Sequence, residues 1–489
     1  MIALGIDCGT QSLKTVALDG ESGRLLASAS RSYGLLDGLP SGHLEQDPQH
    51  WWTALQETVT EVLAALGGRK KEVCGLGVSG QQHGFVPLDA NYEVIRPAKL
   101  WCDTSTVVQC DEIRAALGGR ESVIGLTGND ILPGFTAPKI LWLKQNEPQN
   151  FAKLAHVALP HDFLNLRLTG TLRMEYGDAS GTALLDVRQR RWCDEICAAI
   201  DDALLDKLPV VGSSCQPCGS LRPDLAAAWG LGEVVVSAGG GDNMMAALGT
   251  GNIRPGAVTA SLGTSGTIFA CSEQPVVDPA GEIAAFCSSN DLWLPLLCTM
   301  NVTAVTESFR GLFAWDHARM DREIAAVPAG ADGLLLLPYM QGERTPNLPH
   351  GCGVLHGMAS SNITPAHLAR AAMEGVTLGM AYGLRRMETL GVRPDVIRLT
   401  GGGSKSAVWR QMCADVFGYP VVGLAHAEGA ALGAAIQALA ACDLRRPLAE
   451  WCDRCAPLDE DSRLAPRSTE VYPALLARMN ELRSRVFAD

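Results

Sequence analysis

The feature that most constrains the fold is a short pattern that occurs once in each half of the chain. An apolar strand at residues 2–8 runs into Gly9-Thr10, and a second largely apolar strand follows at residues 13–18. Residues 258–273 repeat the pattern, with a strand on each side of a Gly-Thr-Ser-Gly turn. Because each copy begins about half of the chain, a duplicated α/β architecture divided near its middle is expected.

The composition describes a folded protein and limits its partners. Hydrophobic residues make up 47% of the 489-residue chain and charged residues 19%, values typical of well-packed globular proteins. A chain of this length exceeds one ordinary core, so two or three domains are expected. The formal net charge of -13 argues against nucleic acid or an anionic membrane as the main partner. Backbone N–H groups can still bind a phosphate locally.

No segment is typical of a targeting signal or a membrane span. The N-terminus MIALGID lacks a basic region before a long apolar core, and no stretch approaches the roughly 18 apolar residues of a spanning helix. We therefore expect a cytoplasmic protein without a membrane partner. The pairs Cys215/Cys218 and Cys452/Cys455 lack the close second pair of a zinc site. Scattered cysteines are most often small buried hydrophobes.

Two helices are predicted beside these strands. Asp47-Pro48 starts a helix that Gly67-Gly68 ends, and a strand follows at residues 73–79. The segment 428–441 is a helix rich in small residues. A backbone or a flat ligand can approach such a helix closely.

A third glycine cluster lies near the end of the chain. A strand at residues 396–399 runs into Gly401-Gly402-Gly403, and a helix capped by Ser404 or Ser406 follows. Each of the three glycine turns alone is a weak signal, because such a turn is more often a plain hairpin than a phosphate site. None matches a Walker loop or a dinucleotide site. Their combination indicates two phosphate-binding hairpins and a segment that can hold a nucleoside.

Two acidic residues follow strand ends beside these turns. Asp7 stands where a carboxylate would repel a phosphate unless Mg²⁺ lay between them. Asp242 follows a strand at residues 234–238 and three glycines. An ionised carboxylate beside an alcohol suits a general base for phosphoryl transfer. A helix N-cap is the alternative for Asp242, and the local sequence leaves both interpretations open.

Polar and aromatic residues after another strand favour a polyol site. Gln81, Gln82 and His83 directly follow a predicted strand. A lone histidine is usually structural, but beside two amides at a strand end it is suited to binding hydroxyl groups. Trp101 and Asp103 add candidates, with a core aromatic and a helix cap as the plainer alternatives.

Together these motifs resemble the FGGY family of carbohydrate kinases over essentially the whole chain. GIDCGTQSLK resembles the first phosphate loop of the family, SLGTSG the second, and GGGSKSAVWRQMCAD the adenosine segment, while residues 134–146 and 353–375 fit two family signatures. The resemblance implies a two-domain α/β fold of the actin-like ATPase and sugar-kinase (ribonuclease H-like) type, with duplicated mixed sheets flanked by helices. Residues 1–244 would bind the sugar and residues 245–489 the nucleotide, with the active site in the cleft between them.

The resemblance also implies a reaction and a set of site residues. SGQQHG, AGGGDN and PYMQGERTPN are most similar to the bacterial xylulokinase branch, which implies phosphorylation of the ketopentose D-xylulose to D-xylulose 5-phosphate with ATP and Mg²⁺. Asp242 would be the general base, and Asp7 would position Mg²⁺ through water. The sugar would be bound by Gln82, His83, Trp101, Asp103, Asp242 and Asn243. The phosphates would be bound by Gly9, Thr10, Lys14, Gly263, Thr264 and Ser265. The nucleoside would be bound by Gly402, Gly403 and Ser406.

One segment departs from the family pattern. Related kinases commonly carry Trp-Asn-Asp-x-Arg where this chain has Trp101-Cys102-Asp103-Thr104-Ser105. The sugar contacts therefore stay open, with ribulose, gluconate, fuculose and glycerol as alternative substrates. An ATP-driven conformational protein, actin-like or heat-shock-chaperone-like, is the alternative from another class. The net charge argues against a nucleic-acid partner, and a homodimer stays open.

Overall fold

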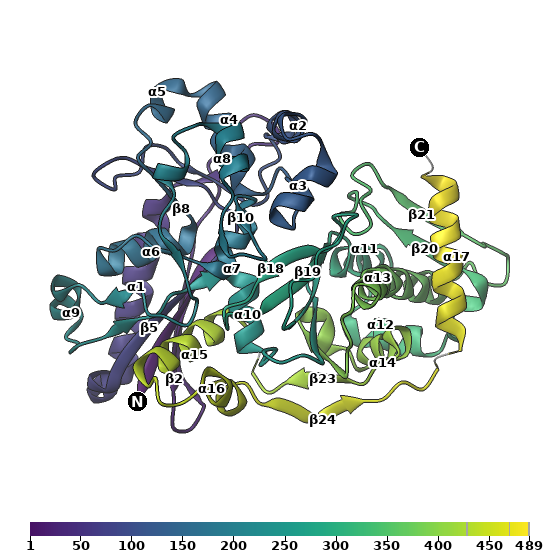
Figure 1. The fold of residues 1–489 in the computed structure, drawn as a ribbon. Coiled ribbons are helices and arrows are strands. Elements are labelled where there is room, and N and C mark those ends of the chain that lie inside the picture. The colour runs from purple at the N-terminus through teal and green to yellow at the C-terminus, as the bar shows by residue number, and fades with distance from the viewer. Residues whose placement is uncertain (427–428, 469, 488–489) are drawn as a thin grey trace.

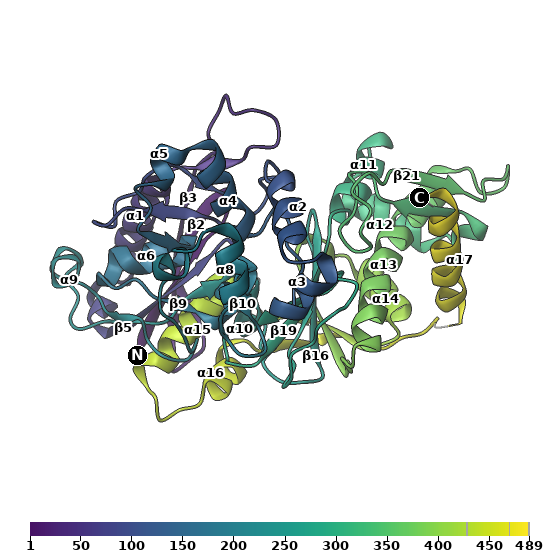
Figure 2. The same cartoon turned by 45° about the horizontal axis from the view of Figure 1, so that its top comes forward.

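Two mixed β-sheets, one in each half of the chain, lie side by side with helices around both (Figure 1). The computed structural model describes residues 1–426, 429–468 and 470–487. The predicted duplicated α/β architecture is confirmed. A second view shows α2 (Val107–Ala116) and α3 (Arg120–Thr127) at the boundary between the two halves (Figure 2).

The first sheet carries the first Gly-Thr turn between two of its strands. β1 pairs antiparallel with β2 and parallel with β5, so Asp7 near the end of β1 lies beside Ser79 near the end of β5. The strand order is β13-β14-β5-β1-β2-β3, and β15 pairs with the end of β5. The bounds are β1 Ile2–Cys8, β2 Ser12–Asp19, β3 Leu25–Ser32, β5 Val73–Gly80, β13 Gly219–Ser220, β14 Val235–Val236 and β15 Gly240–Gly241.

The second sheet repeats this arrangement. β16 pairs antiparallel with β17 and parallel with β22, as β1 does with β2 and β5. The strand order is β18-β19-β17-β16-β22-β23-β24. The bounds are β16 Ala257–Leu262, β17 Gly266–Ala270, β18 Ala284–Cys287, β19 Trp293–Thr299, β22 Val396–Thr400, β23 Val421–Leu424 and β24 Leu458–Leu464. The second Gly-Thr turn therefore joins β16 to β17, and the glycine cluster follows β22.

Both faces of the first sheet are covered, and one of the covering helices comes from the C-terminal part of the chain. α1 (Pro48–Leu66) packs on one face, and the Asp47 side chain caps it by accepting a hydrogen bond from the Gln49 N–H. α15 (Ala430–Cys442) packs on the opposite face. A Cβ on Gly5 would lie 2.0 Å from the Ala431 carbonyl oxygen, so glycine is required for this close approach. The predicted small-residue helix is confirmed from Ala430 onward, while its position 428 lies outside the described residues.

This packing bears on the domain division expected at residue 244. That position lies inside α10 (Asp242–Gly249), which shares a hydrophobic core with α15. α15 and α16 (Leu448–Cys455) lie in sequence between β23 and β24 of the second sheet, yet pack with β1 and β2. The division into domains at residues 1–244 and 245–489 stays a prediction. The hydrophobic core around the first sheet contains residues from both of these ranges.

The other helices divide between the two sheets. Those of the first half are α4 Thr136–Asn146, α5 Pro148–Phe151, α6 Pro160–Thr169, α7 Tyr176–Ala179, α8 Asp194–Ile200 and α9 Pro223–Trp229. Those around the second sheet are α11 Thr303–Leu312, α12 His317–Ala325, α13 Pro365–Thr389, α14 Ala407–Phe417 and α17 Val471–Val486 (Figure 1). The described residues also form five two-stranded ladders: β4 (Glu45–Gln46) with β7 (Ala98–Lys99), β6 (Val86–Leu88) with β8 (His156–Ala158), β9 (Met174–Glu175) with β12 (Val211–Gly212), β10 (Leu185–Asp186) with β11 (Arg191–Trp192), and β20 (Leu335–Pro338) with β21 (Gly353–His356).

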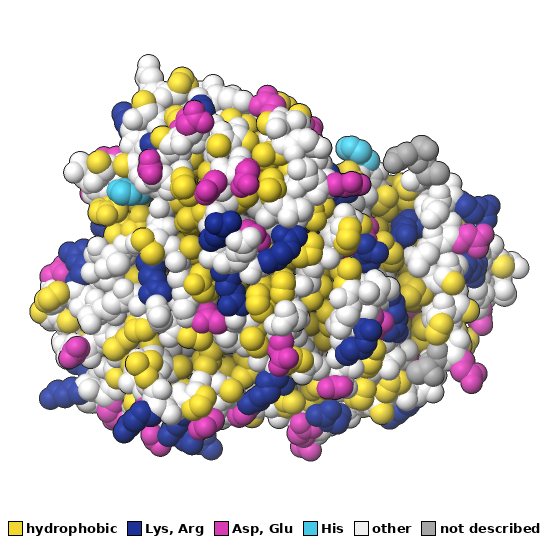
Figure 3. Space-filling view, viewed as in Figure 1, with side chains coloured by type: hydrophobic (Ala, Val, Ile, Leu, Met, Phe, Trp, Pro, Cys, Tyr) yellow, Lys and Arg dark blue, Asp and Glu magenta, His cyan; other side chains and the backbone are white. Residues whose placement is uncertain are grey.

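The surface and the cysteines agree with the composition. On the face drawn in Figure 3, acidic and basic side chains lie interspersed. All sixteen cysteines are described, all are free thiols, and most are buried. Among the helices that the structure describes, none is long and apolar enough to cross a bilayer.

Candidate functional site

Two cavities, lined by residues from both halves of the chain, meet at one group of side chains. The first cavity has a volume of about 490 Å³ and the second of about 750 Å³. Asp242, Asn243, Ser261 and Thr267 line both of them. A group bound in one cavity can therefore be passed to a molecule in the other at this point.

Asp242 stands where the cavities meet. It is the first residue of α10, and the N-cap is Gly241, so the alternative interpretation of Asp242 as an N-cap is wrong. The N–H and the Nδ2 of Asn243 both donate to Asp242 Oδ1, at 2.7 and 2.9 Å. Burial, and then the nearby carboxylates of Asp7 and Asp178, raise the pKa of Asp242 to about 7. A carboxylate with such a pKa is matched to proton transfer near neutral pH.

Gln82 and His83 line the first cavity, and protein contacts fix both of them. Gln82 Oε1 accepts a hydrogen bond from Asn243 Nδ2 at 2.8 Å. His83 has a φ of 64°, and its carbonyl oxygen accepts from Lys139 Nζ at 2.8 Å and from Thr136 Oγ1 at 3.2 Å. Burial and the charge of Lys139 lower the pKa of His83 to about 3, so its imidazole is neutral. A neutral imidazole and an amide are suited to hydrogen bonds with hydroxyl groups.

The first Gly-Thr turn uses its threonine side chain within the protein. Trp101, which lines the first cavity, donates from Nε1 to Thr10 Oγ1 at 2.9 Å, and Thr10 Oγ1 donates to Gln81 Oε1 at 3.1 Å. Gly9, Thr10 and Lys14 border neither cavity. The Thr10 hydroxyl therefore positions the Trp101 ring in this structure. Its expected contact with a phosphate stays a prediction.

The second Gly-Thr turn lies on the cavity wall. Gly263, Thr264 and Ser265 all line the first cavity. The carbonyl oxygens of Gly263 and Thr264 accept from the N–H groups of Thr303 and Val302, at 2.9 and 3.2 Å. These contacts fix the turn against the start of α11, so its wall position is held by the backbone.

The glycine cluster after β22 borders the second cavity. Gly402 lines this cavity as expected, but Gly403 packs against Leu262 and Trp409 and does not. Ser406 is the N-cap of α14: its Oγ accepts from Trp409 N–H at 3.0 Å and donates to Asp321 at 2.8 Å. The structure therefore does not bring Gly403 and Ser406 to the cavity wall.

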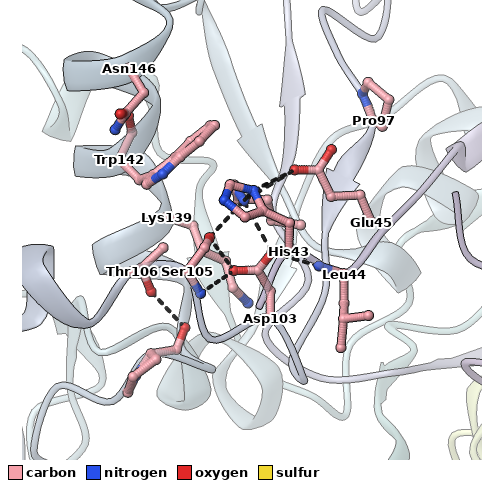
Figure 4. Close-up of polar contacts among 12 residues, drawn as sticks. His43, Leu44, Glu45, Pro97, Asp103, Ser105, Thr106, Lys139, Trp142 and Asn146 are labelled. Atoms are coloured by element: carbon pink, nitrogen blue, oxygen red, sulfur yellow. Dashed lines mark hydrogen bonds and ion pairs between the residues drawn. The ribbon is translucent and has the colours of Figure 1, made fainter. Parts of the chain in front are cut away.

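Asp103 lies away from both cavities, in a buried polar cluster (Figure 4). Its carboxylate accepts from Lys99 Nζ at 3.0 Å and from Ser105 Oγ at 2.6 Å. The Lys99 ammonium, itself fully buried, also pairs with Glu45 at 3.1 Å and lies 4.0 Å from the centre of the Trp142 ring. The structure does not bring Asp103 to the wall of either cavity, because its carboxylate is engaged inside this cluster, and its expected contact with the sugar stays a prediction. Ser105, which stands where related kinases carry arginine, belongs to the same cluster.

His43, Glu45 and Asp103 are also the one group of three close potential metal ligands among the described residues. Lys99 Nζ lies within 3.2 Å of an atom of each of them, so an ammonium already fills the place of a cation. This group is therefore an ion-pair cluster and not a metal centre.

Asp7 offers a better fit to a divalent cation. It lines the second cavity, and Ser79 Oγ donates to its Oδ1 at 3.0 Å. Asp242 borders the same cavity, so two carboxylates face a space large enough for a nucleotide. Carboxylate and water oxygens are the ligands Mg²⁺ prefers, and phosphates complete its shell.

Several cavity residues escaped the sequence reasoning. In the first cavity these are Asn129, Asp130, Phe135, Glu282, Arg344 and Thr345, and in the second Ser404, Lys405, Arg410, Asp459 and Ser462. Phe135, Arg344 and Lys405 lie inside motifs that carried the family resemblance, so the motifs themselves were the signal. Glu282, Asp459 and Ser462 have no local sequence pattern that indicates a site.

Comparison with known proteins gives the same family for both halves. The model described as "FGGY family of carbohydrate kinases, N-terminal domain" matches residues 2–249, and its C-terminal counterpart matches residues 258–442. The xylulose kinase of Haemophilus influenzae is 41% identical over 98% of this chain and 99% of its own length. The xylulose kinase of Escherichia coli is 36% identical over 91% of each chain.

Solved structures extend the likeness to three dimensions. The xylulose kinase from Bifidobacterium adolescentis is 31% identical with a TM-score of 0.84, and that from Rhodospirillum rubrum 27% identical with a TM-score of 0.92, each over 99% of both chains. Plasmodium falciparum glycerol kinase with ADP, 20% identical with a TM-score of 0.89, covers 100% of this chain and 98% of its own and shares the fold.

Proposed function

Since the chain belongs to the FGGY family of carbohydrate kinases and is a phosphotransferase, we propose that it transfers the γ-phosphoryl group of ATP to D-xylulose. The product is D-xylulose 5-phosphate, and Mg²⁺ accompanies the nucleotide. One observation carries the proposal: two cavities, one lined by Gln82 and His83 and one by the glycine cluster, meet at Asp242. The sequence identity of this chain to xylulose kinases, over most of their length, supports the choice of sugar.

In the proposed reaction each group has a task. D-xylulose lies in the first cavity, where Gln82, His83 and Asn243 bind its hydroxyl groups. Asp242 takes the proton of the terminal hydroxyl as that oxygen attacks the γ-phosphorus. Backbone N–H groups of the turn at 263–265 stabilise the charge that develops on the phosphoryl oxygens. Asp7 would hold Mg²⁺ through water, and the bound ion would neutralise phosphate charge.

The proposal predicts how the rate depends on pH. Asp242 acts only when deprotonated, and its pKa is raised to about 7. We therefore expect kcat/KM for D-xylulose to fall about tenfold per pH unit below about pH 7 and to level off above it. Initial rates at saturating MgATP, measured from about pH 5 to about pH 9, check this. A rate that stays level down to about pH 5 would show that no group with a pKa near 7 has to be deprotonated, and would contradict this assignment of Asp242.

Steady-state assays over a panel of sugars test the substrate. We expect kcat/KM to be highest for D-xylulose among D-xylulose, ribulose, gluconate, fuculose and glycerol. A higher value for another member would keep the reaction and replace the sugar. ATP turnover that no sugar accelerates would instead favour the ATP-driven conformational protein.

A further inference from the structure

The first cavity combines acidic side chains with a single cation. Asp130, Asp242 and Glu282 line it, and among its described lining residues Arg344 is the one lysine or arginine. Asp130 is already paired with two arginines of α2 and α3. Asp242 and Glu282 form no ion pair among the described residues, although the Tyr382 hydroxyl donates to Glu282 at 2.8 Å, so both charges remain without a cation beside them. Such a wall suits a neutral sugar but repels a sugar phosphate, unless Arg344 offsets the charge.

Hydrogen bonds connect the segment that carries Arg344 to the second Gly-Thr turn. Its N–H donates to Glu343 Oε1 at 2.9 Å, and the buried Glu343 carboxylate also accepts from Met300 N–H at 2.6 Å and from Asn301 Nδ2 at 3.0 Å. The residues that follow Asn301 donate to the carbonyl oxygens of the turn at 263–265. The loop that carries Arg344 and the turn at 263–265 are therefore connected through the segment 300–303.

The side chain of Arg344 extends from this unit toward the opposite half of the chain. Its guanidinium lies 5.5 Å from the centre of the Trp101 ring, and Trp101 Nε1 donates to Thr10 of the first Gly-Thr turn. The residue is exposed, and no carboxylate in the described part of the chain pairs with its guanidinium. An arginine placed over a cavity without an acidic partner is available to an anionic ligand.

From this juxtaposition we infer that Arg344 binds the phosphoryl group during its transfer to the sugar and afterwards in the sugar-phosphate product. The inference rests on the proposed function and assigns its product-binding residue. The planar guanidinium can donate two parallel hydrogen bonds to a phosphate. D-xylulose itself carries no charge for Arg344 to bind, so the residue discriminates between substrate and product.

Binding measurements on Arg344→Gln and Arg344→Lys test the inference. Calorimetric titration of each variant and the unmodified protein with D-xylulose 5-phosphate, and separately with D-xylulose, gives the dissociation constants. We expect Arg344→Gln to weaken sugar-phosphate binding by about 10- to 100-fold and to leave D-xylulose binding within about twofold. Arg344→Lys keeps the charge without the fork and should lie between. Equal melting temperatures of the three proteins show that the fold is kept.

Two results overturn the inference. Unchanged affinity for the sugar phosphate in Arg344→Gln is the first. Equal weakening for sugar and sugar phosphate is the second, because it would show that Arg344 shapes the cavity for both. Full affinity in Arg344→Lys together with the loss in Arg344→Gln would support phosphate binding at this position and assign it to the positive charge alone. Failure of the unmodified protein to phosphorylate D-xylulose is a separate result, which removes the proposed function itself; the comparison is then made with the sugar that is phosphorylated and its phosphate.

Discussion

Replacing Asp242 with asparagine is expected to lower kcat for sugar phosphorylation by about 10²- to 10⁴-fold, the range of a lost general base. Asparagine has nearly the same shape and can still accept from the N–H of Asn243, which donates to the aspartate at 2.7 Å. The first turn of α10 is therefore preserved. What the variant lacks is a group that can take the proton of the attacking hydroxyl.

Nucleotide binding provides the control for this variant. Asp242 also borders the second cavity, where its negative charge faces the phosphates. Removing that charge should leave the dissociation constant of MgATP unchanged or slightly lower, as calorimetry can show. The residual rate should also lose the acidic limb expected near pH 7, because the titrating group is gone. Weaker MgATP binding with nearly full turnover would contradict the role of base and indicate a structural one.

Replacing Asp103 with asparagine is expected to lower the free energy of unfolding by about 3 kcal/mol, because it leaves a buried ammonium with one carboxylate fewer. Lys99 and Asp103 are both fully buried, and 3.0 Å separates Lys99 Nζ from Asp103 Oδ2. Glu45, 3.1 Å from the same Nζ, remains and limits the loss. The KM for the sugar should change by less than about twofold, since Asp103 borders neither cavity.

A matched control separates burial from charge. Asp111 forms an ion pair with Arg114 but is 71% exposed, so Asp111→Asn should cost less than about 0.5 kcal/mol. Urea titration of both variants and of the unmodified protein measures the two changes in the free energy of unfolding. A large rise in KM without a loss of stability in Asp103→Asn would restore the sugar contact that the sequence resemblance implied.

The sequence predicted the turns and helix starts of this protein that depend only on neighbouring residues. The two Gly-Thr turns, the strands beside them and the start of α1 at Asp47-Pro48 follow from turn and cap preferences alone. The family resemblance then placed the base at Asp242, and the structure puts that residue where both cavities meet. Capping chemistry could not decide this, because aspartate serves both roles.

Contacts between distant segments account for what the sequence did not reveal. Whether Asp103 faces a sugar depends on Lys99 and Glu45, which only the folded chain brings to it. The packing of α15 on the first sheet joins residues more than 400 positions apart, such as Gly5 and Ala431. Arg344 reaches Trp101 across the first cavity, and no short motif encodes that distance.

The most direct test of the central claim is ³¹P NMR of the unmodified protein with MgATP and D-xylulose. The account predicts that ATP signals decline while ADP and D-xylulose 5-phosphate appear in equal amounts, and that omission of the sugar stops the reaction. Release of inorganic phosphate in place of a sugar phosphate, at a rate indifferent to D-xylulose, would contradict it.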